Sequence, residues 1–137
     1  MSEEKKILVL RAWEEIVNQR NLDAFDDFYA ANVVHHEPDK DLQGFEEVKR
    51  YIVMYFDAFS DMSVSVEDLI AEGDEVVIRY TYLGTHQGEL QGVAPTNKHI
   101  EQEGITIHRI EGDKIVEEWT QNDNLSLLQQ LGAVPEQ

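Results

Sequence analysis

The spacing of the apolar residues changes once along the chain, from a helical period to a strand period, and this change limits the folds open to it. Up to residue 59 apolar side chains recur every three or four positions, whereas from residue 64 they alternate. The helical stretches are 4–20, 21–32 and 45–59, and the alternating stretches are 64–70, 76–85, 98–110 and 115–123. Three helices followed by four long antiparallel strands predict an α+β domain, with the helices packed on one face of a curved sheet.

Two shorter segments complete the prediction. Residues 33–37 are expected to be extended, Pro38 stops them, and the polar residues 39–44 form a loop that leads into the third helix. After the last strand, residues 125–131 form a short apolar segment that Gly132 ends. The sequence contains no internal repeat and no linker.

Chain length and charge narrow the domain count and the range of partners. With 137 residues, 42% of them hydrophobic, the sequence can build one core, so residues 1–137 are predicted to form a single domain. Asp and Glu outnumber Lys and Arg by 28 to 11, which gives a net charge of −17. Because such a chain repels a phosphate backbone and an anionic membrane surface, we expect neither nucleic acid nor a membrane as partner.

The absence of certain residues and motifs excludes several kinds of chemistry. The chain has no cysteine, which rules out a disulfide scaffold, a thiolate nucleophile and a cysteine-ligated metal. A glycine-rich phosphate loop, a Gly-x-Ser-x-Gly elbow and a His-Glu-x-x-His pair are also absent. No apolar stretch is long enough to span a membrane, and the initial MSEEKK lacks the apolar core of a signal peptide, so a cytoplasmic location is expected.

The last hairpin carries the polar residues from which a site could be built. If Gly112 and Asp113 are its two turn residues, Ile110 faces Ile115 across the hairpin. Moving away from the turn, every second pair of facing residues then lies on the same side of the sheet as this pair. That side would hold Gln102, Thr106, His108, Glu117, Trp119, Gln121 and Asp123. A cavity with a few convergent polar groups is typical of a small-molecule site, so this stripe is a candidate wall. A solvated outer face or a dimer contact would explain the same pattern.

Asp123 and His36 are the candidate acid/base residues. A carboxyl group enclosed by apolar walls has a raised pKa and can transfer protons near neutral pH, although the residues around Asp123 on their own favour a cap for the last helix. His35 and His36 are adjacent in an extended segment, so they point to opposite faces and cannot share one metal ion. We predict that His36 is the one that faces inward, and a purely structural histidine is the alternative.

Arg79 and Tyr82 lie in the second predicted strand and point in opposite directions. A buried arginine in mid-strand needs a carboxylate partner or a ligand anion, and a cross-strand glutamate is the simpler partner. Tyr82 is a candidate for ligand contact, whereas most such aromatic residues are part of the core.

Several short motifs, in order, resemble the SnoaL-like polyketide cyclases of the nuclear transport factor 2-like superfamily. They are Ala58-Phe59-Ser60-Asp61, Ala71 to Val76, Gly84 to Gly88, Pro95-Thr96, Ile110 to Trp119 with Asp123, and Gln130-Leu131-Gly132. The resemblance covers nearly the whole chain. Asn97 and Ser60 depart from the family pattern, which has Gly and Pro there, and Asn97 can adopt the left-handed turn conformation in place of Gly.

The resemblance implies a cone-like curved antiparallel sheet with three N-terminal helices, enclosing a pocket without metal or organic cofactor. It also implies a homodimer formed through the outer face of the sheet. Family members that are cyclases close rings by intramolecular aldol chemistry, with the aspartate that matches Asp123 as general acid/base and an inward residue, here matched to His36, holding the substrate. The chain is thus predicted to be a cofactor-independent acid/base enzyme for a small hydrophobic carbonyl compound. The alternative is a non-catalytic binding or dimerisation module.

The predicted site has two parts. The catalytic residues are Asp123 and His36, and the substrate-binding residues are Trp119, Gln121, His108, Gln102, Thr106, Tyr82 and Arg79.

Overall fold

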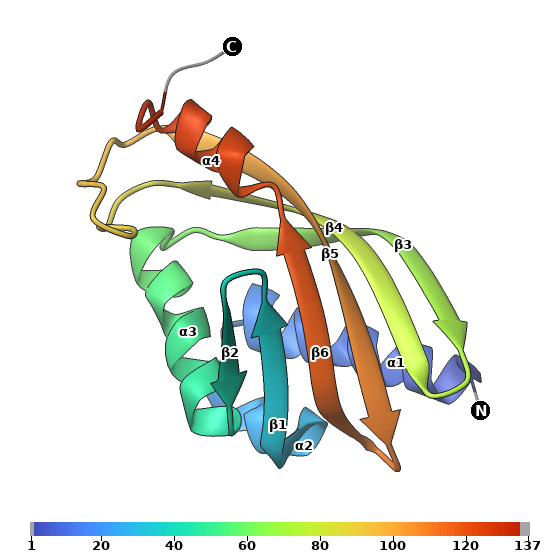
Figure 1. Cartoon of the computed structure of the whole chain (residues 1–137). Helices are drawn as coiled ribbons and strands as arrows, with labels where there is room; N and C mark the ends of the chain where they lie inside the picture. Colours follow the sequence, from blue (N-terminus) through green and yellow to red (C-terminus); the bar gives the residue numbers. More distant parts are fainter. Residues whose placement is uncertain (1, 135–137) are drawn as a thin grey trace.

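The computed structural model describes residues 2–134 and shows a curved sheet with helices on one side (Figure 1). The helical elements are α1 (Ser2–Ala12), a π-helix (Trp13–Asn18), a 3-10 turn (Leu22–Ala24), α2 (Phe25–Phe28), α3 (Phe45–Ala58) and α4 (Asn124–Gln130). The strands are β1 (Tyr29–Glu37), β2 (Lys40–Gln43), β3 (Ser63–Glu72), β4 (Glu75–Thr85), β5 (His99–Glu111) and β6 (Lys114–Asn122). The predicted α+β class, with helices packed on a curved sheet, is confirmed.

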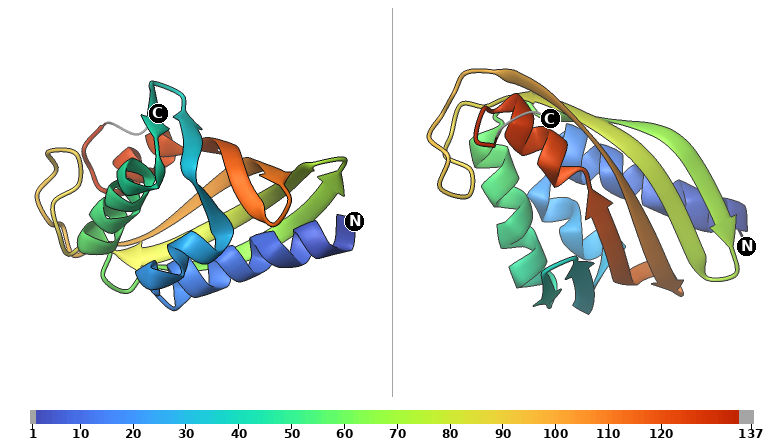
Figure 2. Two further views of the ribbon diagram at one scale, coloured as in Figure 1. Left: turned by 90° about the horizontal axis from the view of Figure 1, so that it is seen from below. Right: turned by 45° about the horizontal axis from the view of Figure 1, so that its top comes forward.

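The strand order explains where a hollow can form. The six strands lie in the order β2-β1-β6-β5-β4-β3, and the sheet is open because β2 and β3 are its two edges. The strands bend over α1, which packs against β3 and β4, while α3 lies beside β1 and β2 (Figures 1 and 2). Four strands are antiparallel as predicted, but β1 pairs with β6 in parallel, so the sheet is mixed and not wholly antiparallel.

The first helix changes geometry halfway along. The helix predicted over residues 4–20 is α-helical only to Ala12, and Trp13–Asn18 continue it as a wider π-helix. Ile16 and Val17 of this segment are buried against the sheet. Short π-helical segments occur often at functional sites, and this one positions Trp13 on the inner side of the fold.

The second predicted helix is shorter than its sequence pattern indicates. The helix ends at Phe28, and the chain becomes β1 at Tyr29, four residues before the predicted extended segment. The predicted polar loop forms the edge strand β2, which pairs with β1 through contacts such as His36 with Asp41. The backbone hydrogen bonds of this ladder stabilise a segment that is too polar to be recognised as a strand by hydrophobic alternation.

A β-bulge in β6 overturns the predicted register of the last hairpin. Ile110 pairs with Ile115 as predicted, but Arg109 pairs with Glu117, so Val116 has no partner on β5. One extra residue moves every later side chain of β6 to the other face. Glu118, Thr120 and Asn122 therefore point inward, and the predicted inward residues Glu117, Trp119 and Gln121 lie on the outer face.

The core fills the space between the helices and the inner face of the sheet. Among its most deeply buried side chains are Phe25, Phe59, Ile78, Ile100 and Ile110. Each such side chain contributes about 1.5–3 kcal/mol through removal of its apolar surface from water. This packing holds the inner faces of β1, β4, β5 and β6 at a fixed distance from α3 and the π-helix, which leaves a hollow between them.

Candidate active site

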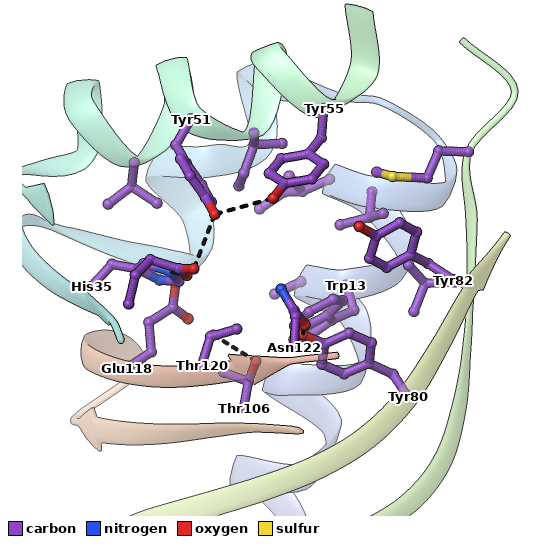
Figure 3. Close-up of a pocket in the computed structure, with 18 of the residues that line it drawn as sticks. Trp13, His35, Tyr51, Tyr55, Tyr80, Tyr82, Thr106, Glu118, Thr120 and Asn122 are labelled. Carbon is purple, nitrogen blue, oxygen red and sulfur yellow. Dashed lines mark hydrogen bonds and ion pairs between the residues drawn. The ribbon is translucent and has the colours of Figure 1, made fainter. Parts of the chain in front are cut away.

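A cavity of about 110 Å³, partly open to solvent, lies between the inner face of the sheet, the π-helix and α3 (Figure 3). Its wall is formed by Ala12, Trp13, Ile16, Val17, Tyr29, His35, Glu37, Val48, Tyr51, Ile52, Tyr55, Met62, Val64, Tyr80, Tyr82, Thr106, Glu118, Thr120 and Asn122. Most of the exposed wall is apolar or aromatic, and the polar groups are few, which is the usual composition of a small-molecule site.

A buried histidine held between two carboxylates forms one side of the cavity. His35 Nδ1 lies 2.7 Å from Glu118 Oε1, and its Nε2 hydrogen-bonds to Glu37 Oε2. Tyr51 donates from its hydroxyl to the other oxygen of Glu37 at 3.0 Å. β1 supplies His35 and Glu37, β6 supplies Glu118, and the parallel pairing of these strands brings His35 opposite Glu118.

The carboxylates control the charge of this histidine. Burial alone would lower the pKa of His35, but hydrogen bonds and charge attraction from Glu118 and Glu37 raise it to about 10. Burial would raise the pKa of Glu118, and its contacts with His35 instead hold that pKa below the usual value. His35 is therefore an imidazolium at neutral pH and donates both of its N–H groups, one to each carboxylate.

Tyrosines extend this polar chain at both ends. Tyr29 donates to Glu118 Oε2 at 3.1 Å, and the hydroxyls of Tyr51 and Tyr55 lie 3.3 Å apart. Burial raises the pKa of all three phenols, and the nearby carboxylates raise it further. All three remain protonated at neutral pH, so Tyr29 and Tyr51 donate to the carboxylates and Tyr55 donates to the oxygen of Tyr51, whose own proton is donated to Glu37.

His108 lies behind the wall and holds Trp13 in place. Trp13 Nε1 donates to His108 Nε2 at 2.9 Å, and His108 Nδ1 lies 3.0 Å from the carbonyl oxygen of Val76. The ring therefore carries its proton on Nδ1, and burial lowers the pKa of His108, so the imidazole is neutral. Although His108 Nε2 is 3.7 Å from Glu118, its accepting role toward Trp13 assigns it to support of the wall.

The side of the cavity opposite His35 depends on a glycine. Tyr80 donates from its hydroxyl to Asn122 Oδ1, and Thr106 and Thr120 hydrogen-bond to each other at 2.8 Å below them. A Cβ at Gly104 would lie 2.1 Å from Asn122 Oδ1, so any larger residue would displace this pair. Gly104 thus makes room for the amide and the phenol that line the wall.

Tyr82 presents the one cavity-lining hydroxyl that has no partner among residues 2–134. Its side chain is only 6% exposed, yet its hydroxyl oxygen makes no hydrogen bond within the protein. In Figure 3 this oxygen points into the open centre of the cavity. A buried hydroxyl without a partner costs about 1–3 kcal/mol, which a ligand or water in the cavity would recover.

Asp123 and His36, the predicted catalytic residues, are both outside the cavity. Asp123 is exposed and caps α4, accepting from the Ser126 backbone N–H at 3.0 Å, so the prediction of an enclosed carboxyl is wrong. His36 points to the outer face, between Asp41 at 2.7 Å and Glu117 at 2.6 Å. The inward histidine is His35, because residues that alternate along β1 place Val33 and His35 on the buried face.

The predicted substrate-binding residues divide into three groups. Tyr82 and Thr106 line the cavity, whereas Gln102 and His108 are buried but lie outside its wall. Trp119 and Gln121 are on the outer face because of the bulge at Val116, and Trp119 stacks on His36 there.

Arg79 is exposed on the outer face and has the cross-strand carboxylate partner that its sequence position favoured. Its Nε donates to Asp68 at 2.6 Å, and Glu103 lies 3.7 Å from its Nη1. Its guanidinium does not reach the cavity wall.

Sequence reasoning missed Glu37, Glu118, Tyr51 and Trp13, along with His35. Tyr55 is on the buried side of α3, and Tyr51 is one turn earlier on the same side, so helical spacing was a signal that could have found it. Glu118 could not be found by alternation, because Glu117 beside it offers the same side chain to the opposite face.

The family of the chain is shown by its similarity to known proteins. The sequence model of the SnoaL-like polyketide cyclases matches residues 7–131. The chain belongs to the SnoaL-like polyketide cyclase family. Among solved structures, AclR from Streptomyces galilaeus, a candidate hydroxylase, has 28% identity and a TM-score of 0.89 over 100% of this chain and 86% of its own. No curated protein sequence matches the chain significantly.

Two further structures support the same fold. IdmH from Streptomyces antibioticus, a candidate polyketide cyclase, has 28% identity and a TM-score of 0.83, over 93% of this chain and 98% of its own. A candidate SnoaL-like polyketide cyclase from Jannaschia sp. CCS1 has 20% identity and a TM-score of 0.91, over 98% of this chain and 96% of its own, which shows the fold alone.

Two kinds of feature are absent from the described part of the chain. Within residues 2–134, no group of three His, Cys, Asp or Glu side chains is arranged to hold a metal ion. In the same range, no helix is long and apolar enough to cross a membrane.

Proposed function

We propose that the cavity is the active site of a cofactor-independent acid/base enzyme that removes a proton α to a carbonyl group of a small substrate. The observation that carries the proposal is the imidazolium of His35, held between two buried carboxylates in the wall of an aromatic cavity. A titratable group shifted by specific charged partners inside a pocket is the usual sign of proton-transfer chemistry. Membership of the polyketide cyclase family is consistent with aldol ring closure as the reaction.

Glu37 and His35 would share the proton transfers. Glu37 takes the proton from the α-carbon, and the enolate carbon attacks a second carbonyl of the same substrate to form the ring. His35 gives its Nε2 proton to the resulting alkoxide, and the proton on Glu37 then returns to His35 across their hydrogen bond. Glu118, on Nδ1 at 2.7 Å, orients the ring and keeps it charged.

The developing enolate needs a donor that does not have to reorganise. Tyr82 offers a hydroxyl without a partner in the wall of the same cavity. A preorganised donor at such a position is worth about 3–4 kcal/mol of transition-state stabilisation. The apolar wall excludes water, which strengthens that interaction.

A binding module without catalysis is the second candidate. It is favoured by one observation, which is that Glu37, His35 and Glu118 already satisfy one another and Tyr29 and Tyr51. A fully satisfied polar chain of this kind also serves to fix the shape of a cavity. The two candidates differ in whether a bound carbonyl compound exchanges its α-protons.

The test is deuterium exchange at the α-carbon of cyclopentanone and acetophenone in heavy water, followed by proton NMR. The wild-type protein is expected to accelerate exchange, and Glu37→Gln to reduce the acceleration by about a hundredfold or more, because general-base catalysis contributes at least that factor. Asp123→Asn is the matched control and is expected to keep the wild-type rate, since Asn also caps a helix. Exchange no faster than in buffer would leave the binding module as the function.

A further inference from the structure

The cavity is surrounded by aromatic rings that meet at steep angles. The aromatic box consists of Trp13, Tyr29, Tyr51, Tyr55, Tyr80 and Tyr82. The angle between the ring planes is 67° for Tyr51 and Tyr55, and 79° for Tyr55 and Tyr82. Rings set in this way form adjoining walls, and Figure 3 labels all of them except Tyr29 around the open centre.

The charge inside the box is negative. His35 supplies one positive charge, Glu37 and Glu118 supply two negative charges, and no lysine or arginine is part of the wall formed by the described residues. Tyr29 donates to Glu118, Tyr51 donates to Glu37, and His35 donates to both, so the two carboxylates act only as acceptors, as ionised carboxylates do. The wall therefore carries one uncompensated negative charge in a largely apolar setting.

One lysine approaches the box from outside. Lys40 is exposed, and its Nζ lies 5.1 Å from the centroid of the Tyr51 ring. It does not line the cavity, and solvent screens its charge. Among the described residues, the positive group of the cavity wall is therefore His35 alone.

We propose that the cavity binds a compact organic cation, so that the substrate carries a protonated amine or quaternary ammonium group. Aromatic faces attract cations by about 2 kcal/mol or more when the site is desolvated, and the surplus carboxylate charge adds to this attraction. The free oxygen of Tyr82 can accept from an ammonium N–H. The inference rests on the proposed function in one respect, since it names the substrate class of the same site. Its test is independent of that function, because binding is measured without turnover.

The size of the cavity sets the size of the cationic group. A cavity of about 150 Å³ holds a benzene molecule, and the cavity here is about 110 Å³. It can enclose a trimethylammonium group or a small ring, with the rest of a larger substrate in the open side. An anionic group of the same size would meet Glu37 and Glu118, whose two negative charges exceed the single positive charge of His35.

Three probes of one shape separate charge from size. Choline is the cation. The neutral isostere is 3,3-dimethylbutan-1-ol, in which a carbon atom replaces the nitrogen of choline, and the anion is the carboxylate 3,3-dimethylbutanoate. Trp119→Phe leaves Trp13, in the cavity wall, as the single tryptophan and thus as the fluorescence reporter of binding. In this background choline is expected to bind about tenfold tighter than the neutral alcohol, and the anion not to bind.

Two variants and one control locate the preference. Glu37→Gln removes a charge but keeps the shape, and Tyr80→Leu removes one aromatic wall, so each is expected to reduce choline affinity several-fold and leave that of the alcohol nearly unchanged. Glu117→Gln removes a carboxylate from the same sheet, on the outer face, and is expected to change neither affinity. Using two variants keeps the test valid if one of them does not fold.

Three results would overturn the inference: no choline binding at saturating concentrations, equal or tighter binding of the alcohol, or an equal loss in Glu117→Gln. α-Proton exchange combined with a preference for the neutral alcohol would refute the cationic substrate and leave the proposed function standing. Choline binding without exchange of any ketone would do the reverse.

Discussion

The two faces of the sheet at β1 and β6 each carry a triplet of one histidine and two carboxylates, in different surroundings. On the inner face His35 lies between Glu37 and Glu118, and on the outer face His36 lies between Asp41 and Glu117 at 2.7 and 2.6 Å. The side chains of the inner pair His35 and Glu118 are 9% and 5% exposed, whereas those of the outer pair His36 and Glu117 are 26% and 24% exposed. Each histidine contacts one glutamate of β6, whereas the second carboxylate is Glu37 of β1 inside and Asp41 of β2 outside, and the inner triplet is the more deeply buried.

Burial changes what each triplet can do. The pKa of both histidines is raised by hydrogen bonds to carboxylates, but only for His35 is burial a large opposing effect. Outside, solvent and salt screen the charges, and the imidazole exchanges protons with water. Inside, low exposure to solvent favours transfer of the proton along the triplet or to a bound molecule, which is the condition for directed proton transfer.

The largest expected effect is on stability when one carboxylate of each triplet is neutralised. Glu118→Gln leaves a buried imidazolium with one fewer partner and is expected to lower the free energy of unfolding by about 3–5 kcal/mol. Glu117→Gln, the outer counterpart, is expected to lower it by less than about 1 kcal/mol. Urea denaturation of both variants measures the difference, and equal losses would show that the two faces do not differ as described.

The pH dependence of stability should separate the two histidines next. Because folding raises the pKa of His35 from 6.5 to about 10, its contribution is complete below pH 6.5 and is lost as the pH rises through 10. His35→Asn is expected to flatten the decline in unfolding free energy across this range. His36→Asn is expected to keep most of the decline at high salt, where screening weakens the outer triplet. Denaturation at several pH values would contradict the comparison if His36→Asn alone removed the slope.

The smallest of the three effects is the loss of stability when the size of a side chain is changed on the inner or the outer face of β5. Gly104→Ala places a Cβ 2.1 Å from Asn122 Oδ1 and 2.6 Å from Tyr80 Oη, and overpacking of this kind costs about 1–3 kcal/mol. Ile105→Ala, the next residue and 45% exposed on the outer face, is expected to cost less than about 1 kcal/mol. Thermal unfolding of the two variants measures the difference. A tolerated Gly104→Ala would show that the Tyr80–Asn122 pair is not fixed.

Much of the fold could be predicted because periodicity reflects burial directly. The helical stripe over 45–59 and the alternation in β4 and β5 each record which side chains face the core. The early end of the second helix and the strand over 40–43 could not be predicted in this way. The start of β1 depends on its pairing with the distant strand β6, which local spacing does not contain, and β2 pairs with β1 across a tight turn but is too polar to show alternation.

The site was harder to predict than the fold because it depends on single residues at points of ambiguity. Alternation tells that His35 and His36 face opposite sides but not which is inside, and Glu117 and Glu118 present the same ambiguity. The bulge at Val116 decides the second case, and no glycine or other local signal marks it. The family resemblance assigned a catalytic role to Asp123. The structure instead shows the alternative, in which Asp123 caps α4.

The bulge also gives the protein an unusual way to vary. The end of β6 contains two interleaved wall sequences, one with Glu118, Thr120 and Asn122 and the other with Glu117, Trp119 and Gln121. The length of chain between Ile115 and Glu117 selects which of them lines the cavity. A single-codon change in length at this point, without any substitution, would therefore exchange an acid, a hydroxyl and an amide for an acid, an indole and a longer amide, giving a differently shaped binding site in one genetic step.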